Sequence, residues 1–94
     1  MKLAFEWDTQ KAKENLRKHT ISFDEALTVL SDPFSITIPD PDHSIDEQRY
    51  IDIGVSSKHR VLVVVYTERG NKIRLISCRK ATAAERRRYE EGNA

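Results

Sequence analysis

The chain has 94 residues, of which 38% are hydrophobic, enough for one modest core and a single domain over residues 1–94. No segment approaches the twenty or so apolar residues of a membrane span, and no secretory signal opens the chain, so we expect a cytoplasmic protein without a membrane segment. The single cysteine, Cys78, cannot form an internal disulfide, which fits a reducing compartment.

The net charge of +1 hides an uneven distribution along the chain. Residues 1–47 carry five Lys and Arg against ten Asp and Glu, whereas residues 48–94 carry eleven against five. Two solvated faces of a charged protein would explain this pattern. A basic working surface in the second half, with an acidic segment that meets a basic partner, would explain it equally well.

The N-terminal segment predicts a strand followed by a helix. Residues 3–7 form a short apolar and aromatic run, typical of a strand. Asp8 is a good N-cap for a polar helix over residues 9–18. Trp7 has two interpretations, because it can pack onto Ala12 and shield the helix start, or stack on a nucleic-acid base.

A second helix is predicted to start at Ser22. Ser22 and Glu25 have the spacing of a capping box, in which the hydroxyl bonds the Glu25 amide and the carboxylate reaches back to the cap. One apolar face follows, and Asp32-Pro33 ends the helix. The apolar face consists of Phe23, Ala26, Leu27 and Leu30.

The apolar period changes to two after this helix. Residues 35–38 alternate as a strand, and residues 39–47 form an acidic loop rich in turn residues. In the next strand, apolar residues of 51–55 alternate with Asp52 and Gly54. We therefore expect the face that carries Asp52 and Gly54 to contact water.

Two further strands and a hairpin turn are predicted next. Residues 61–66 are continuously apolar, as in a central strand covered on both faces, and residues 68–71 form the turn. Residues 73–78 then alternate, which predicts that Leu75 and Cys78 lie on opposite faces. We interpret Cys78 as a buried, inert thiol.

A second capping box, Thr82–Glu85, predicts a short C-terminal helix with little apolar surface. The order of elements indicates an α+β fold. We expect an antiparallel sheet of four to five strands, two N-terminal helices on one face, and the short C-terminal helix.

Metal binding has weak support in the sequence. His19, His43 and His59 have no close spacing to one another or to Cys78. An ion site at His43 in the acidic loop is conceivable, but a solvated loop is the favoured interpretation. We expect neither a metal nor another cofactor.

The polar residues that remain suit metal-free cleavage of RNA. That reaction needs a base for the 2′-hydroxyl, an acid for the leaving 5′-oxygen, and cations for the charge on phosphorus. Taken singly, each candidate also fits an ordinary surface or capping role. The candidates are the phosphate-binding cations Arg79 and Lys80, the Lys18-His19 pair, Glu68 and the Tyr89 phenol, with Arg60, Tyr66, Arg74 and Arg86 as further RNA contacts.

Seven segments, in order, resemble the BrnT toxins over about residues 5–90. They are Phe5–Asp8, Asn15–His19, Ser22–Ala26, Asp40–His43, Thr67–Gly70, Ile76–Thr82 and Glu85–Tyr89. The resemblance implies a RelE-like ribonuclease of a type II toxin–antitoxin system that blocks translation. It also implies a BrnA-like antitoxin that binds the toxin directly, carries the DNA-binding domain and forms a heterotetramer built on an antitoxin dimer.

By position, the resemblance places functional weight on a defined set of side chains. The catalytic candidates are Lys18, His19, Glu68, Arg79, Lys80 and Tyr89, with Thr67 and Glu85 beside them. Thr20 and Tyr66 depart from the family pattern, which often has Gly and His at these positions. A positive φ at Thr20 would be strained, and a phenol is a poorer general base. A non-catalytic nucleic-acid-binding module and a protein-interaction domain are the alternatives.

Overall fold

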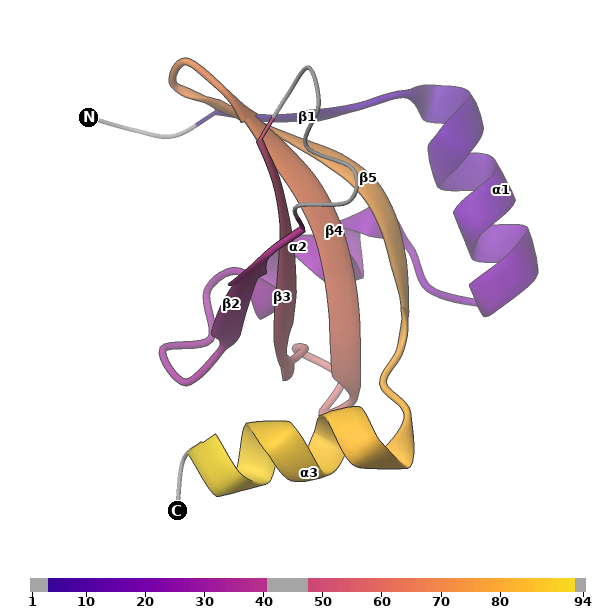
Figure 1. Ribbon diagram of the computed structural model, residues 1–94. Helices are drawn as coiled ribbons and strands as arrows, with labels where there is room; N and C mark the ends of the chain where they lie inside the picture. Colours follow the sequence, from indigo (N-terminus) through magenta and orange to yellow (C-terminus); the bar gives the residue numbers. More distant parts are fainter. Residues whose placement is uncertain (1–3, 41–47, 93–94) are drawn as a thin grey trace.

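A computed structural model describes residues 4–40 and 48–92 and shows a five-stranded sheet with three helices (Figure 1). The strands lie in the order β1-β5-β4-β3-β2. No helix in these ranges has the length and apolar character needed to cross a membrane. The elements are β1 (Ala4–Trp7), α1 (Thr9–His19), α2 (Phe23–Val29), β2 (Ile36–Pro39), β3 (Arg49–Val55), β4 (Val61–Arg69), β5 (Lys72–Lys80) and α3 (Ala83–Gly92).

The sheet is mixed, so the expectation of an antiparallel sheet is wrong for one pair. Strands β2 to β5 are antiparallel neighbours, as their chain order and the tight β4–β5 turn require. Strand β1 pairs with β5 in parallel and places Trp7 opposite Leu75. No hairpin links these two strands, so no local signal sets their direction.

Trp7 belongs to the core side of the sheet. Its ring meets Phe23 edge to face, with centroids 5.8 Å apart. Trp7 is half-buried and packs against the hydrophobic core, together with Ala12. This arrangement favours the packing interpretation of Trp7 over base stacking.

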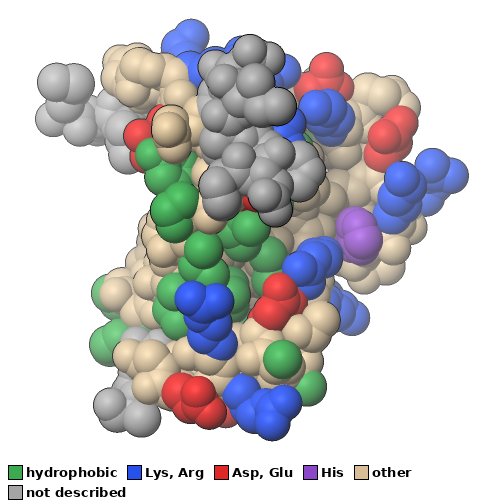
Figure 2. Space-filling model, in the orientation of Figure 1, with side chains coloured by type: hydrophobic (Ala, Val, Ile, Leu, Met, Phe, Trp, Pro, Cys, Tyr) green, Lys and Arg blue, Asp and Glu red, His purple; other side chains and the backbone are tan. Residues whose placement is uncertain are grey.

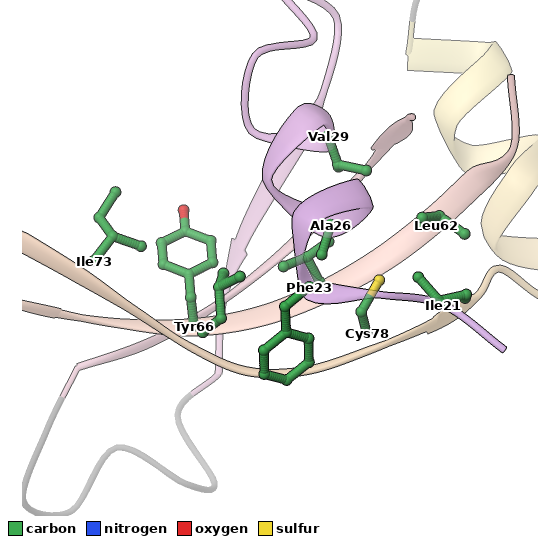
Figure 3. Packing of buried hydrophobic residues seen from close by; sticks show 10 residues of the cluster. Ile21, Phe23, Ala26, Val29, Leu62, Tyr66, Ile73 and Cys78 are labelled. Atoms are coloured by element: carbon green, nitrogen blue, oxygen red, sulfur yellow. The ribbon is translucent and has the colours of Figure 1, made fainter. Parts of the chain in front are cut away.

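The hydrophobic core lies between α2 and one face of the sheet, which we call the α2 face (Figure 3). Strand β4 contributes Leu62, Val64 and Tyr66, and α2 contributes Phe23 and Val29. The opposite face is turned toward the reader in Figure 1, with α2 behind the sheet. We call it the front face; by strand register it carries Arg49, Ile51, Ile53, Val63, Val65, Thr67, Arg74, Ser77 and Arg79.

The prediction of a wet face on β3 is wrong, because Asp52 and Gly54 face α2. Asp52 is buried and accepts a hydrogen bond from the Tyr66 hydroxyl at 3.1 Å. Burial raises the pKa of its carboxyl group. At Gly54, a Cβ would lie 3.1 Å from the Val29 side chain and 3.0 Å from that of Ser35. The strand therefore uses a glycine to let α2 approach.

A β-bulge corrects the predicted alternation along β5. Val65 pairs with Ser77, but the next residue, Tyr66, pairs with Leu75, so Ile76 is an extra residue in β5. Leu75 and Cys78 consequently both join the core on the α2 face. Ser77 turns to the front face instead.

The predicted helix starts are confirmed in their backbone contacts. Asp8 accepts from the Lys11 amide at 3.0 Å, and Ser22 accepts from the Glu25 amide at 3.1 Å. The Glu25 carboxylate does not close its capping box, because it binds Arg60 and Ser56. The second box, Thr82–Glu85, closes in both directions, at 2.8 and 3.2 Å.

Thr20 ends α1 in the left-handed region, with φ 58° and ψ 29°. A β-branched side chain is strained there, whereas glycine is not. We expect Thr20→Gly to stabilise the protein by about 1 kcal/mol and to raise Tm by roughly 4–8 °C, measured by thermal unfolding. Thr9→Gly, at the first residue of the same helix, serves as the control and should lower Tm. A lower Tm for Thr20→Gly would contradict the strain at this position.

Candidate functional site

Helix α1 is fixed to the outer edge of β5 by one buried side chain, Asn15. Strand β1 covers only Lys72–Leu75 of β5. Beyond that point Asn15 takes over the pairing: its Oδ1 accepts from the Cys78 amide at 3.0 Å, and its Nδ2 donates to the Cys78 carbonyl at 2.8 Å and the Ile21 carbonyl at 3.1 Å. The last turn of α1 is thereby held beside the strand.

A pocket of about 160 Å³ lies between α1 and β5. The Lys18 and His19 side chains, at the helix end, reach it together with Ser77 from the strand. The full lining is Lys11, Glu14, Asn15, Lys18, His19, Ile76 and Ser77. The structure thus brings a potential proton carrier and an ammonium group next to the front face.

Arg79 extends this group along the same strand. Ser77 and Arg79 are two residues apart on the front face, so their Cα atoms are separated by about 7 Å. The Arg79 guanidinium binds Glu85 through two bonds, Nη1 to Oε1 at 2.7 Å and Nη2 to Oε2 at 2.9 Å. Glu85 also accepts from the Thr82 amide at 2.8 Å. The capping box of α3 therefore holds the guanidinium in a fixed orientation.

The Arg79 guanidinium holds the pKa of Glu85 at about 2, below the usual 4.5. Because the folded-state pKa is depressed, the stability from this pair is present above pH 4.5 and is lost as the pH falls toward 2. We expect the midpoint of urea unfolding to fall less between pH 4.5 and pH 2 in Glu85→Gln than in the parent protein. Identical pH profiles for the variant and the parent would contradict the ion pair.

Around this group, the front face has an apolar floor with charged margins. Figure 2 shows hydrophobic side chains across the middle of the sheet, with Lys and Arg side chains toward α1 and α3. Ile53 and Val63 of the floor are buried. At the far end of the face Arg74 forms an ion pair with Glu6 at 3.2 Å, next to the buried Thr67.

Lys80 and Arg79 do not share a face, although they are adjacent in the sequence. Arg79 lies opposite Val63, whereas Lys80 lies opposite Leu62, which belongs to the core under α2. Successive residues of a strand point to opposite sides of the sheet. The predicted basic pair is therefore divided between the two faces.

Two of the predicted RNA contacts also lie on the α2 side. Tyr66 is buried, and its hydroxyl donates to Asp52. Burial and the neighbouring carboxylate raise the pKa of this phenol. Arg60 donates its Nε to Glu25 at 3.0 Å, at the start of β4. These placements separate Tyr66 and Arg60 from the front-face group.

Glu68 and Tyr89 occupy two other places. Glu68 pairs with Ile73 of β5. Ile73 is six residues before Arg79 on that strand, so Glu68 is roughly 20 Å from Arg79. The Tyr89 hydroxyl donates to Asp32 at 2.6 Å, and its pKa is raised to about 12, mainly by desolvation and by this bond. Tyr89 thus ties α3 to the segment after α2. Arg86 is exposed on α3.

Three side chains in or near the site were missed from the sequence. An asparagine in the middle of a helix is a poor helix former, and this signal could have marked Asn15. Ser77 was misplaced because the bulge has no signature in the sequence. The partnership of Glu25 with Arg60 joins residues 35 positions apart, and no local pattern reveals it.

The prediction of an ion at His43 lies outside the described residues. Within residues 4–40 and 48–92, no group of three or more His, Cys, Asp and Glu side chains is placed to hold a metal ion.

Comparisons with known proteins identify the family of the chain. The family model described as "Ribonuclease toxin, BrnT, of type II toxin-antitoxin system" matches residues 7–85. No curated protein sequence gave a significant match. Among solved structures, the chain is similar to the ribonuclease toxin BrnT of Brucella abortus, with 26% identity and a TM-score of 0.65, covering 87% of this chain and 97% of the other. Because the family match spans most of its length, the chain belongs to the BrnT family of ribonuclease toxins of type II toxin–antitoxin systems.

Proposed function

We propose that the chain cleaves RNA without a metal ion, at the group formed by the α1 pocket and Arg79. The observation that carries this proposal is the anchoring of α1 by Asn15, which puts His19 and Lys18 beside Ser77. The next front-face residue of β5 is Arg79, already oriented by Glu85. A proton carrier, a cation and a fixed guanidinium are the groups that metal-free cleavage needs.

The reaction starts with a proton transfer from the 2′-hydroxyl of RNA to His19, whose imidazole is the side chain most often used for this purpose near neutral pH. The 2′-oxygen attacks the adjacent phosphorus, and the bond to the 5′-oxygen breaks. The leaving oxygen takes up a proton from water, so the products are a 2′,3′-cyclic phosphate and a 5′-hydroxyl. Arg79 and Lys18 stabilise the extra negative charge on phosphorus.

The proposed roles follow the positions of the side chains. Arg79 has five N–H donors: two bind Glu85, and the second Nη1–H donates to the Lys80 carbonyl at 3.2 Å. Within residues 4–40 and 48–92, the Nε–H and one Nη2–H remain for a phosphate. Glu85 acts as a positioning residue. Tyr66 is left out of the mechanism, because its hydroxyl is buried against Asp52.

The partners follow from the family. As a toxin of a type II toxin–antitoxin system, the chain acts on RNA and has an antitoxin partner. We propose that this antitoxin is BrnA-like, that an antitoxin dimer and the toxin form a heterotetramer, and that DNA is contacted through the antitoxin alone. We further propose a RelE-like architecture, inhibition of translation and a cytoplasmic location.

The test uses the purified toxin, a structured RNA and excess EDTA. We expect cleavage to persist in EDTA, and we expect His19→Ala to lower kcat by about 10²–10⁴-fold, the usual contribution of a proton-transfer group. Arg17→Ala is the matched control, since Arg17 is exposed on the same helix and does not line the pocket.

Two results would count against the proposal. Cleavage that stops in EDTA and returns with Mg²⁺ would show a metal-dependent reaction. Equal activity of the His19 and Arg17 variants would remove His19 from proton transfer. Binding of RNA without strand scission by the parent protein would instead favour a non-catalytic module.

A further inference from the structure

A second arginine is fixed by a carboxylate on the α2 side of the sheet. Glu25, in the first turn of α2, has a side chain only 2% exposed. Its Oε2 accepts from Arg60 Nε at 3.0 Å and from Ser56 Oγ at 2.7 Å, and its Oε1 accepts from Arg60 Nη2. The Arg60 hydrogen bonds are the largest influence on Glu25 and lower the pKa of its carboxyl group.

This ion pair fixes the direction of the guanidinium. Both bonds use the Nε–Nη2 edge of Arg60, so the Nη1 amine and one Nη2–H point away from Glu25; within the described chain, Arg60 donates to no other side chain. The Arg60 side chain remains 28% exposed. A buried ion pair brings little net stability compared with an apolar pair of similar size. What it does provide here is a rigid fork with one free edge that faces solvent.

Two lysines lie near the Glu25–Arg60 pair. Lys80 is opposite Leu62, and Arg60 lies two residues before Leu62, immediately ahead of β4. Arg60 and Lys80 are therefore diagonal neighbours at this end of the sheet, with Cα atoms about 7–8 Å apart. Lys58, in the β3–β4 turn, is close enough to act on the charge of Glu25. The turn itself is tied to α2, because the Ser57 amide donates to Thr28 Oγ1 at 2.8 Å.

We infer that Arg60, Lys80 and Lys58 form a phosphate-binding subsite that holds the RNA backbone away from the cleavage site, with Glu25 as the positioning residue for Arg60. The subsite is on the opposite face of the sheet from Arg79, at the same end of β5. An RNA strand that is cleaved at the front face passes around this end of the sheet to reach the subsite. The inference rests on the proposed action on RNA, but it concerns binding and not the chemical step.

The test measures binding of a 2′-O-methyl RNA oligonucleotide, which lacks the attacking hydroxyl and so cannot be cleaved. Fluorescence anisotropy over a series of KCl concentrations gives the affinity and its salt slope. We expect Lys80→Ala to lower the slope by about 0.7 and to raise Kd about fivefold at 0.1 M salt, the loss of one phosphate contact on single-stranded RNA. The matched control is Lys72→Ala, an exposed lysine at the other end of β5, which should leave both values unchanged.

Arg60→Lys tests the positioning role without leaving Glu25 unpaired. The lysine keeps the positive charge but lacks the free guanidinium edge that would bind the phosphate. Kd should therefore rise, while the salt slope stays close to that of the parent. An Arg60→Lys variant with the parent's Kd would overturn the positioning role of Glu25.

Other outcomes would overturn the subsite itself. Equal effects of Lys80→Ala and Lys72→Ala on RNA binding would show that general surface charge, and not a defined subsite, binds the RNA. In a parallel assay with a cleavable RNA, a fall in kcat at unchanged KM for Lys80→Ala would move Lys80 into the cleavage site. Weaker binding of the antitoxin with unchanged RNA binding would assign the surface to a protein partner. Because the binding probe is uncleavable, the binding outcomes are distinct from a failure of the cleavage mechanism.

Discussion

Replacement of Arg79 with alanine is expected to lower kcat for RNA cleavage by about 10²–10³-fold, the usual cost of removing one preorganised donor at the reacting centre. The physical reason is the fixed guanidinium. Glu85 holds Arg79 through two hydrogen bonds, so the phosphate meets an oriented donor that needs no rearrangement in the transition state. Steady-state cleavage of a short RNA in EDTA, with kcat and KM determined separately, measures the effect.

Three companion variants separate orientation from charge. Arg79→Lys keeps the charge without the planar fork and should recover only part of kcat. Glu85→Gln keeps one acceptor but frees the guanidinium, so its kcat should fall less than that of Arg79→Ala. Arg87→Ala removes an exposed cation of α3 and is the control for general charge. A change in KM alone for Arg79→Ala would show that Arg79 binds RNA but does not act in the chemical step.

Elements with local signals were predicted well from the sequence. The Asp8 cap and the Thr82–Glu85 capping box each depend on residues three positions apart, and both form as expected. The hairpin turn between β4 and β5 is marked in the same way by Gly70, with φ 61°. These features are fixed by residues close together in the sequence, so they can be read without the fold.

The faces of the sheet could not be predicted, because they depend on distant contacts. Asp52 and Gly54 resemble a solvent-facing pair, but Tyr66 satisfies the carboxylate, and the glycine admits α2. The bulge at Ile76 of β5 then places Cys78 on the same face as Leu75. Arg79 and Lys80 lie on opposite faces simply because they are adjacent in a strand. Only the choice of face for each of them depends on the register.

The candidate site was predicted in part. Arg79, Lys18 and His19 were recognised as candidates, and the structure brings the latter two to one pocket beside the strand of Arg79. Their supporting partners were not all recognised. Glu25 has the spacing of a capping-box residue, yet its carboxylate is committed to Arg60 on another element.

The largest expected effect on stability is at Asn15. We expect Asn15→Ala to destabilise the protein by about 3–5 kcal/mol, because it leaves the amide and carbonyl of Cys78 and the carbonyl of Ile21 without partners, each worth about 1–3 kcal/mol when buried. That is a large share of the roughly 5–15 kcal/mol that holds a domain folded. Urea unfolding at neutral pH measures the change through the midpoint at constant slope.

Asn15→Asp separates hydrogen bonding from packing. The aspartate keeps the shape and one acceptor for the Cys78 amide, but its second oxygen faces the carbonyl groups of Cys78 and Ile21, so the loss should be as severe as for alanine. Gln10→Ala, exposed on the same helix, should change stability by no more than about 0.5 kcal/mol. If Asn15→Ala costs less than about 1 kcal/mol, below the cost of even one such unpaired group, α1 is held to β5 by other contacts, and the position of His19 beside Ser77 does not depend on this side chain.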